Sequence, residues 1–336
     1  MNIITENGKN YLDTYIAKID NTTIDCSPFF IDLEDAQSEL VKQLNKEHKT
    51  HFTYLNEQNY GYPIQSILNR FSGSYFSASF LKSYEDNPAG CFYSMLCEDD
   101  ADSATRTGSV VHKILEDYYL LPKEQRTREK LIEIQNANLV EGQDNDKICS
   151  YIEGYLNTKD YLTGETLDDS QLDCECEYRG KSKIYVKDYD LHLPTCAYVI
   201  DRIDFRDDDI YIVDYKTGNV TNKNLTFEGN LGQMILYKWL VEQKFDKEVK
   251  EVYICAPGNK KYMKVDCGKE NQEQMIERVS NFFTQFKQDN ARRVYTYTNK
   301  GYFTNTAMRE FREIMNDNSI RFAKIPVKVY IGEEKR

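Results

Sequence analysis

Residues 197–218 read AYVIDRIDFRDDDIYIVDYKTG and contain the most informative pattern in the sequence. Two runs rich in β-branched and aromatic residues flank one polar turn at Arg206–Asp209, which is the pattern of a β-hairpin. If those four residues form the turn, Phe205 faces Ile210 on the opposite strand. The sequence therefore predicts an antiparallel hairpin, and the pairs further from the turn follow by counting.

That count places two carboxylates opposite each other. Ile203 faces Ile212, and Asp201 faces Asp214 at the end away from the turn, with Lys216 on the same face. Facing carboxylates repel, and if partly buried they need a proton or a cation between them. A divalent cation such as Mg²⁺ binds carboxylate and water oxygens and would resolve the conflict. The alternative is a surface hairpin whose acidic residues are simply solvated.

The sequence around the hairpin predicts a mixed α/β fold in which helices pack on a small sheet. Helical periodicity is found at 79–84, 107–121, 127–140, 146–161, 231–244 and 272–288. Strand patterns are found at 172–178, 184–186, 197–205, 210–215, 252–256 and 261–265. Between the two sets of patterns, Thr163–Ser170 is rich in turn-forming residues and is expected to be a loop.

Composition restricts the class of protein. The 336 residues carry a net charge of −12, which argues against a protein that coats nucleic acid without specificity. No stretch is apolar enough to span a bilayer, and the start lacks the pattern of a secretory signal. We therefore expect a cytoplasmic protein, in a cell or in an infected host. The nine cysteines include no Cys-x-x-Cys pair, so neither a zinc ribbon nor a disulfide framework is predicted.

Basic residues outnumber acidic ones from Arg292 onward. The segment also alternates basic with aromatic side chains, a composition suited to stacking on unpaired nucleotides. A solvated charged surface is the alternative meaning of such a pattern. The candidate nucleic-acid contacts are Arg292, Arg293, Tyr295, Tyr297 and Lys300.

Further motifs occur in a fixed order around the hairpin. They are Phe76-Ser-Ala-Ser-Phe-Leu81, Cys91-Phe-Tyr93, Gly108-Ser-Val-Val-His112, Asp201 on an apolar strand, Asp214-Tyr-Lys-Thr-Gly218 and Gln233-Met-Ile-Leu-Tyr237. In this order and spacing the chain resembles the PD-(D/E)XK nuclease superfamily, and within it the RecB-like branch. The resemblance covers about residues 77–256. One departure is Tyr198, which stands where the family usually has Gly.

The resemblance implies a restriction-endonuclease-like core and a set of metal ligands. Asp201, Asp214 and the main-chain carbonyl of Tyr215 would bind Mg²⁺ or Mn²⁺, and His112 would add a nitrogen ligand. Lys216 would position the attacking water and offset charge on the transition state. One or two ions are compatible with the sequence.

Four more residues are candidates around this set. By resemblance Gln233 would contact the site or the DNA backbone, and Tyr237 lies one helical turn later. Glu116 lies four residues after His112, so it is a candidate to orient the imidazole or to bind a second ion. Glu177 is a candidate to reach the metal from the preceding strand.

The activity that the resemblance implies is hydrolysis of phosphodiester bonds in DNA. An exonuclease in recombination, repair or viral DNA processing is the preferred role, with linear ends or single-stranded segments as substrate. The alternatives are a structure-specific endonuclease or nickase on the same core, a catalytically silent member that binds DNA or a protein, and an α/β binding protein. Some RecB-like members hold an iron–sulfur cluster, but only Cys255 and Cys267 follow Tyr237, so we expect none here.

Three regions are expected along the chain. Residues 1–70 would form an N-terminal extension with an amphipathic helix near Glu34–Lys49. Residues 71–290 would form the RecB-like core, with a helical insertion at about 120–165. Residues 291–336 would form the basic, aromatic C-terminal region.

Overall fold

The structure is a computed structural model. It describes residues 75–94, 103–166, 168–292, 294–301, 309 and 312–313, together with the backbone of strands at 2–6, 9–18, 29–31 and 322–333. The helix expected near Glu34–Lys49 lies outside the described residues.

The chain divides into two compact units. The central unit is Asp102–Arg278, and the terminal unit combines Met1–Ala101 with Val279–Arg336. Every residue predicted to bind metal or to act in catalysis, from His112 to Tyr237, belongs to the central unit.

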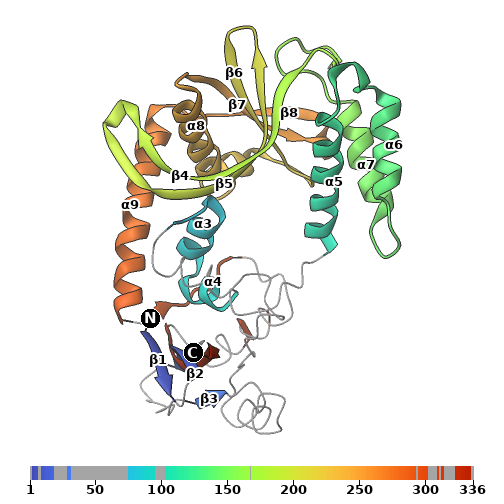
Figure 1. Ribbon diagram of the computed structural model, residues 1–336. Helices are drawn as coiled ribbons and strands as arrows, with labels where there is room; N and C mark the ends of the chain where they lie inside the picture. The colour runs from blue at the N-terminus through green and yellow to red at the C-terminus, as the bar shows by residue number, and fades with distance from the viewer. Residues whose placement is uncertain are drawn as a thin grey trace. The chain divides into compact units, whose positions relative to one another are not determined.

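A mixed five-stranded sheet organises the central unit (Figure 1). Its order is β4-β5-β6-β7-β8, and only the β6–β7 pair is parallel. The strands are β4 Asp173–Val186, β5 Leu191–Arg206, β6 Asp209–Tyr215, β7 Val249–Ala256 and β8 Lys261–Val265. The predicted α/β fold, a small mixed sheet flanked by helices, is confirmed.

Three helices before the sheet pack on one of its faces and share a core with it. They are α5 Ser103–Tyr119, α6 Arg128–Asn138 and α7 Asn145–Leu156. Their apolar residues meet ring and aliphatic side chains of β6 and β7, among them Tyr211, Val213 and Tyr253. Side-chain caps set where two of the helices begin, because Thr127 accepts from the N–H of Lys130 and Asp144 from that of Lys147.

The helix α8 Leu231–Phe245 connects the parallel strands β6 and β7, as a parallel pair requires. It is followed, after β8, by the long helix α9 Lys269–Arg292. Short 3₁₀ turns lie at Lys123–Gln125, Lys187–Tyr189, Asn222–Leu225 and Pro257–Asn259. Within the described part of the chain, no helix has the length and apolar character needed to cross a membrane.

The β5–β6 hairpin has the predicted register. Ile203 pairs with Ile212 and Phe205 with Ile210, and Arg206 pairs with Asp209 across the turn. The backbone of Asp207 has φ +53°, a left-handed conformation that Asp tolerates better than most residues. The paired residues end at Arg202 and Val213, one position before the two carboxylates.

The strands β4 and β5 are longer than predicted. Two strands were expected at 172–178 and 184–186, but β4 is continuous through the polar residues Arg179–Lys183. These residues pair with the first half of β5, which begins at Leu191 rather than at Ala197. Backbone pairing with a neighbour sustains a strand without apolar alternation, so the hydrophobic pattern gave no sign of this segment.

The terminal unit has a second five-stranded sheet. Its order is β1-β2-β10-β3, and β9 also pairs with β10. The strands are β1 Asn2–Glu6, β2 Lys9–Lys18, β3 Phe29–Ile31, β9 Val294–Thr296 and β10 Phe322–Glu333. The unit also contains α3 Ala78–Asp86 and α4 Pro88–Ser94. Rings of Phe80 and Tyr84 on α3 pack edge-on against Phe282 and Phe286 of α9.

Candidate metal centre

The centre lies where β6 separates from β5. Beyond Val213 the N–H of Tyr215 donates to the Asp201 carboxylate (N to Oδ2, 2.6 Å) instead of to the β5 main chain. On its other side Tyr215 pairs with Cys255 of β7, whose carbonyl also accepts from the N–H of Lys216 at 3.0 Å. The Asp201 side chain therefore spans the gap between the two diverging strands.

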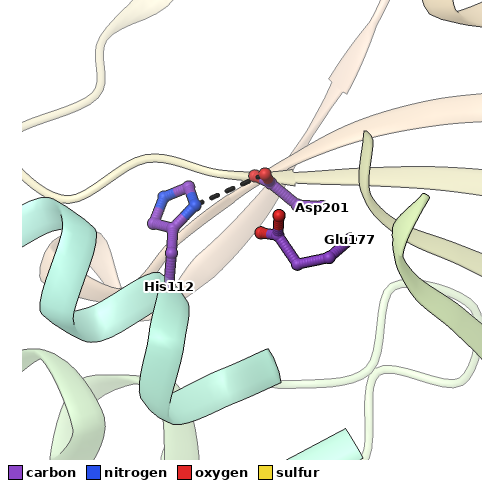
Figure 2. A group of neighbouring side chains, drawn as sticks. All are labelled: His112, Glu177 and Asp201. Carbon is purple, nitrogen blue, oxygen red and sulfur yellow. Dashed lines mark ion pairs between the residues drawn. The ribbon is translucent and has the colours of Figure 1, made fainter. Parts of the chain in front are cut away.

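The helix α5 brings His112 to this gap. Its Nδ1 lies 3.3 Å from Oδ1 of Asp201 (Figure 2). Its Nε2 lies 3.0 Å from the carbonyl oxygen of Tyr215. Both ring nitrogens thus face acceptors. Burial lowers the pKa of His112, but the hydrogen bond to Asp201 and the negative charge of that carboxylate together outweigh burial, and the net pKa is raised. Three of the expected ligands, the imidazole, the Asp201 carboxylate and the Tyr215 carbonyl, therefore converge.

Gly108 explains how α5 comes so close. It lies one turn before His112, and a Cβ added there would be 3.0 Å from Oγ1 of Thr217, directly after Lys216. A side chain at this position would require the Thr217 hydroxyl to move, so glycine allows the helix to approach the end of β6 closely. This packing gives a physical reason for the glycine in the Gly-x-x-x-His motif.

The second carboxylate, Asp214, is 1% exposed and pairs with the ammonium of Lys216 (Nζ to Oδ2, 2.6 Å). Burial raises the pKa of Asp214 to about 6, against the opposing charge of Lys216. Asp201 differs: burial alone would raise its pKa, but the hydrogen bond and charge of His112, the charge of Lys216 and the N–H of Tyr215 together lower it. The two predicted carboxylates thus lie in different electrostatic environments.

Glu177 approaches the same point from β4. One ligand atom each of His112, Glu177 and Asp201 lies within 4.8 Å of the others (Figure 2). Cys176 pairs with Arg202 and Tyr178 with Ile200, so Glu177 lies opposite Asp201 but outside the ladder. Its backbone has φ +48°. Burial raises the pKa of Glu177, and the charge of Asp201 adds to the effect. The sequence pattern did not predict a left-handed backbone conformation at Glu177.

Arg179 offsets part of the acidic charge and was not identified from the sequence. Its Nη2 lies 3.0 Å from Oε2 of Glu177 and 3.5 Å from Oε1 of Glu116. Glu116 also pairs with Lys113 at 3.2 Å. The structure therefore places Glu116 in a charged group beside the centre, bonded to cations rather than to the imidazole.

The helix α8 presents Gln233 and Tyr237 together. The Gln233 amide donates to the Tyr237 hydroxyl (Nε2 to OH, 2.7 Å). Tyr237 is buried, and burial raises its pKa, with a further contribution from the negative charge of Asp214.

A cleft opens over the centre. Its volume is about 440 Å³, and its walls are Thr105, Gly108, Ser109, His112, Lys113, Glu116 and Glu177. A larger cavity of about 1030 Å³ lies elsewhere in the central unit, beside Trp239 and Cys267, and contains none of the predicted site residues.

The candidate contacts near the C-terminus belong to the terminal unit. Tyr297 is 6% exposed and its hydroxyl donates to the carbonyl of Arg312 at 3.4 Å, so this ring is not available for stacking on a base. Lys300 is exposed. Arg293 and the side chains of Arg292 and Tyr295 lie outside the described residues.

The donor set fits a hard divalent cation. It offers carboxylate oxygens, a main-chain carbonyl and one imidazole nitrogen, and none of these ligands is a thiol. Oxygen-rich sites suit Mg²⁺ and Mn²⁺, whereas softer metals favour thiolates. The acidic groups that repel one another here would also be stabilised by such a charge.

A family model described as the PD-(D/E)XK nuclease superfamily matches residues 75–318. The chain belongs to this superfamily. PD-(D/E)XK nucleases use divalent metal ions and act on nucleic acid, and the centre described above supplies ligands for such an ion. The search of curated proteins found no match.

Among solved structures, the chain matches one titled "Crystal structure of SSO0001". The two are 10% identical, and the match covers 74% of this chain and 86% of that chain with a TM-score of 0.28. A score this low supports no conclusion about the present chain.

Proposed function

We propose that the protein is a Mg²⁺- or Mn²⁺-dependent deoxyribonuclease of the RecB-like branch. The observation that supports this best is the convergence of His112, Asp201 and the Tyr215 carbonyl beside the buried Asp214–Lys216 pair. A solvated surface hairpin, the alternative reading of the acidic residues, does not fit carboxylates that are 9% and 1% exposed.

The proposed ligands are Asp201, Asp214, His112 and the Tyr215 carbonyl. When bound there, a divalent cation supplies Lewis-acid chemistry to water and to phosphoryl oxygens. Glu177 lies close enough to His112 and Asp201 to assist as a ligand or as an acceptor for an ordered water.

Lys216 is the proposed catalytic cation. Its ammonium is held against Asp214, two residues earlier on β6, and 29% of its side chain remains exposed. It can therefore hold a water molecule for attack and stabilise negative charge that develops on the phosphoryl group. Asp214 keeps the ammonium in place, because the buried pair restrains a side chain that is otherwise flexible.

Gln233 and Tyr237 are proposed to act from the other side of Asp214. The Gln233 amide donates to Tyr237, so its carbonyl oxygen and remaining N–H are left to bind water or a phosphate oxygen. The Gln233–Tyr237 pair on α8 and the Gly108–His112 motif favour the RecB-like branch within the superfamily.

The preferred substrate is linear DNA, attacked at ends or in single-stranded segments during recombination, repair or viral DNA processing. The test compares linear with closed circular DNA in Mg²⁺, Mn²⁺ or EDTA. We expect loss of the linear DNA with either metal and none in EDTA. Cleavage of closed circles would instead assign an endonuclease.

Asp214→Asn is the control for the site. It keeps the shape of the side chain but removes the charge, and cleavage should be lost while the unfolding temperature stays close to that of the wild type. Failure of the wild-type protein to cut any nucleic acid would contradict the proposed enzyme. Full activity of Asp214→Asn would contradict the proposed site.

A further inference from the structure

A second polar cluster lies on the opposite face of β5 from Asp201. Arg202 and Asp204 are both 0% exposed and form a two-point ion pair, with Nε to Oδ1 at 2.7 Å and Nη2 to Oδ2 at 2.9 Å. Taking both charges out of water costs several kcal/mol per ion, so such a pair is weak evidence for added stability. Its presence in the core therefore calls for another explanation.

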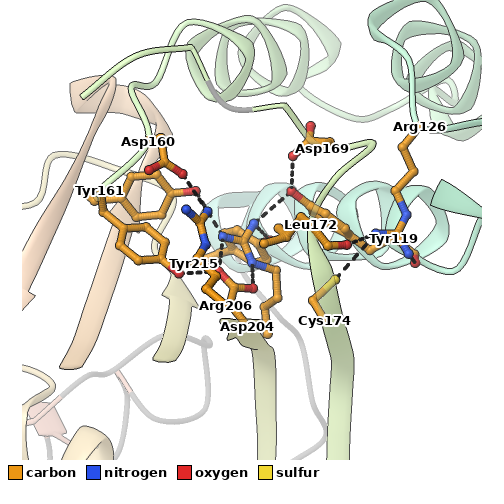
Figure 3. Close-up of polar contacts among 12 residues, drawn as sticks. Tyr119, Arg126, Asp160, Tyr161, Asp169, Leu172, Cys174, Asp204, Arg206 and Tyr215 are labelled. Carbon is orange, nitrogen blue, oxygen red and sulfur yellow. Dashed lines mark hydrogen bonds and ion pairs between the residues drawn. The ribbon is translucent and has the colours of Figure 1, made fainter. Parts of the chain in front are cut away.

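Four phenol groups surround the guanidinium. Nη1 lies 2.9 Å from the hydroxyl oxygen of Tyr119, 3.2 Å from that of Tyr155 and 3.0 Å from that of Tyr215, and Nη2 lies 3.2 Å from that of Tyr262. Tyr119 donates in turn to Asp169, and Tyr161 donates to Asp204 (Figure 3). Both terminal nitrogens of the guanidinium are thus hydrogen-bonded, and Nε faces Asp204 in the ion pair.

Two of the four phenol partners of Arg202, Tyr119 and Tyr215, come from elements that supply proposed metal ligands. Arg202 itself follows Asp201 on β5. Tyr119 lies on α5, seven residues or about two turns after His112, so it lies along the same helix. Tyr215 lies on β6 between Asp214 and Lys216. One guanidinium therefore joins β5, α5 and β6.

Tyr215 is the most direct of these links. Its N–H bonds to Asp201 and its carbonyl contacts His112, while its ring passes to the other face and its hydroxyl meets Arg202. At this position the β5–β6 ladder has already ended, so main-chain pairing with β5 no longer fixes the residue. The bond to Arg202 adds a second side-chain connection between the two strands, beside the Asp201 bond, at the point where the strands diverge.

From this arrangement we infer that Arg202 is a positioning residue for the metal centre, acting through the Tyr215 hydroxyl. The inference rests on the proposed function, because it assigns a role toward the ligands named there. Arg suits the role better than Lys, since its planar group can bond Asp204 at two points and still reach phenols on other elements. The buried pair then serves to fix the geometry of the metal ligands, and not to add to the free energy of unfolding.

The test is Mn²⁺ binding to the full-length protein without DNA, measured by calorimetric titration. Tyr215→Phe removes only the hydroxyl and leaves the ring, the backbone and three phenol partners of Arg202. Loss of a group that orients metal ligands lowers affinity about 10–100-fold, and we expect a rise in Kd of at least about tenfold. Tyr262→Phe is the matched control, because Tyr262 also bonds Arg202 but lies on β8, which supplies no ligand.

A purely structural role would lower the unfolding temperature in both variants and leave both Mn²⁺ affinities near the wild-type value. The inference predicts weaker binding in Tyr215→Phe with Tyr262→Phe within about twofold of the wild type. Equal affinity in all three proteins, or equal loss in both variants, would overturn it. If Tyr215→Phe does not fold, Arg202→Lys serves instead: it keeps the charge beside Asp204, and weakened binding is again expected.

The same titration separates this inference from the proposed function. If the wild-type protein binds no Mn²⁺, the proposed metal centre fails and the positioning role fails with it. When the wild type binds and Tyr215→Phe binds equally well, only the positioning role is wrong.

Discussion

At the scale of single residues, the centre depends on groups of the same kind held in different surroundings. Asp201 bonds His112 and a main-chain N–H, and its pKa is lowered although burial alone would raise it. Asp214 is more deeply buried with one lysine, and its pKa is raised to about 6. Carboxylates placed in different surroundings are a recurring property of sites that bind metal or transfer protons.

Lys216→Ala tests the proposed division of labour between ligands and catalytic cation. Because the ammonium is not a metal ligand, the variant should still bind Mn²⁺. Removing a group that stabilises transition-state charge costs about 10²–10³ in rate, so single-turnover cleavage of DNA should fall by that order. Wild-type rates, or loss of Mn²⁺ binding equal to that of Asp214→Asn, would argue against a role in the chemical step.

Asp160 gives a prediction about pH. Its carboxylate accepts from Arg206 (Nη2 to Oδ2, 2.5 Å; Figure 3). It also accepts from the N–H groups of Leu162 and Thr163. Burial would raise its pKa, but the bond to Arg206 and the two N–H bonds outweigh burial and lower it. A lowered pKa contributes stability that is complete above the unfolded value of about 3.9 and is lost as pH falls through the folded value.

Asp160→Asn should therefore lower the free energy of unfolding at pH 7 by about 1–3 kcal/mol, the range for a hydrogen bond to a charged group. The deficit should shrink near pH 3, where the wild-type carboxylate also begins to take up a proton. Urea titrations of both proteins at the two pH values measure this. The same deficit at both would show that the charge of Asp160 is not what stabilises the loop.

At the scale of elements, close packing of α7 against the turn after β7 is set by one glycine. A Cβ on Gly154 would be 2.2 Å from the carbonyl oxygen of Pro257, which is backbone and has little room to move. Gly154→Ala should destabilise the protein by about 1–3 kcal/mol, although alanine favours helices. The neighbouring exposed Glu153 is the control, and Glu153→Ala should change stability by less than about 0.5 kcal/mol in urea unfolding. A stable Gly154→Ala variant would contradict the packing.

Sequence reasoning predicted most elements of the central unit, because burial imposes a period on them. The hairpin register followed from the polar turn Arg206–Asp209, and β8 Lys261–Val265 was predicted with its observed ends. The polar middle of β4 was missed, since it is held by pairing with β5 and not by apolar alternation. The left-handed Glu177 was missed as well, because Glu carries no signal for such a backbone.

The site was predictable only in part for a similar reason. His112, Asp201, Asp214 and Lys216 could be chosen because their motifs resemble a family, and the structure brings them together. The buried Arg202–Asp204 pair could not, since alternating polar residues on a strand indicate a solvated face unless the tyrosines of distant helices are known to cover it.

At the scale of the whole molecule, strands from both ends of the chain form one sheet. β2 pairs with β10 along most of its length, although some three hundred residues separate them in the sequence. Neither the N-terminal nor the C-terminal pattern indicates its partner, because pairing over such a separation depends on the intervening fold. The structure shows two compact units. The division into three regions that the sequence suggested stays a prediction.

The net charge of −12 yields a prediction about DNA binding. A protein of this charge repels the phosphate backbone at long range, so the bound cation should be needed for association. Fluorescence anisotropy with labelled DNA and the Lys216→Ala variant should show binding in Mn²⁺ and at least about tenfold weaker binding in EDTA. Equal affinity in both would point instead to a basic surface outside the metal centre.

The most direct test of the metal centre is crystallographic. Crystals soaked in Mn²⁺ are measured at a wavelength where manganese scatters anomalously, and the anomalous difference map locates the ion. We expect a peak within bonding distance of Asp201, Asp214 and the Tyr215 carbonyl, with His112 turned toward it. A protein whose cleavage requires Mn²⁺ but whose only anomalous peaks lie away from these residues would contradict the proposed centre.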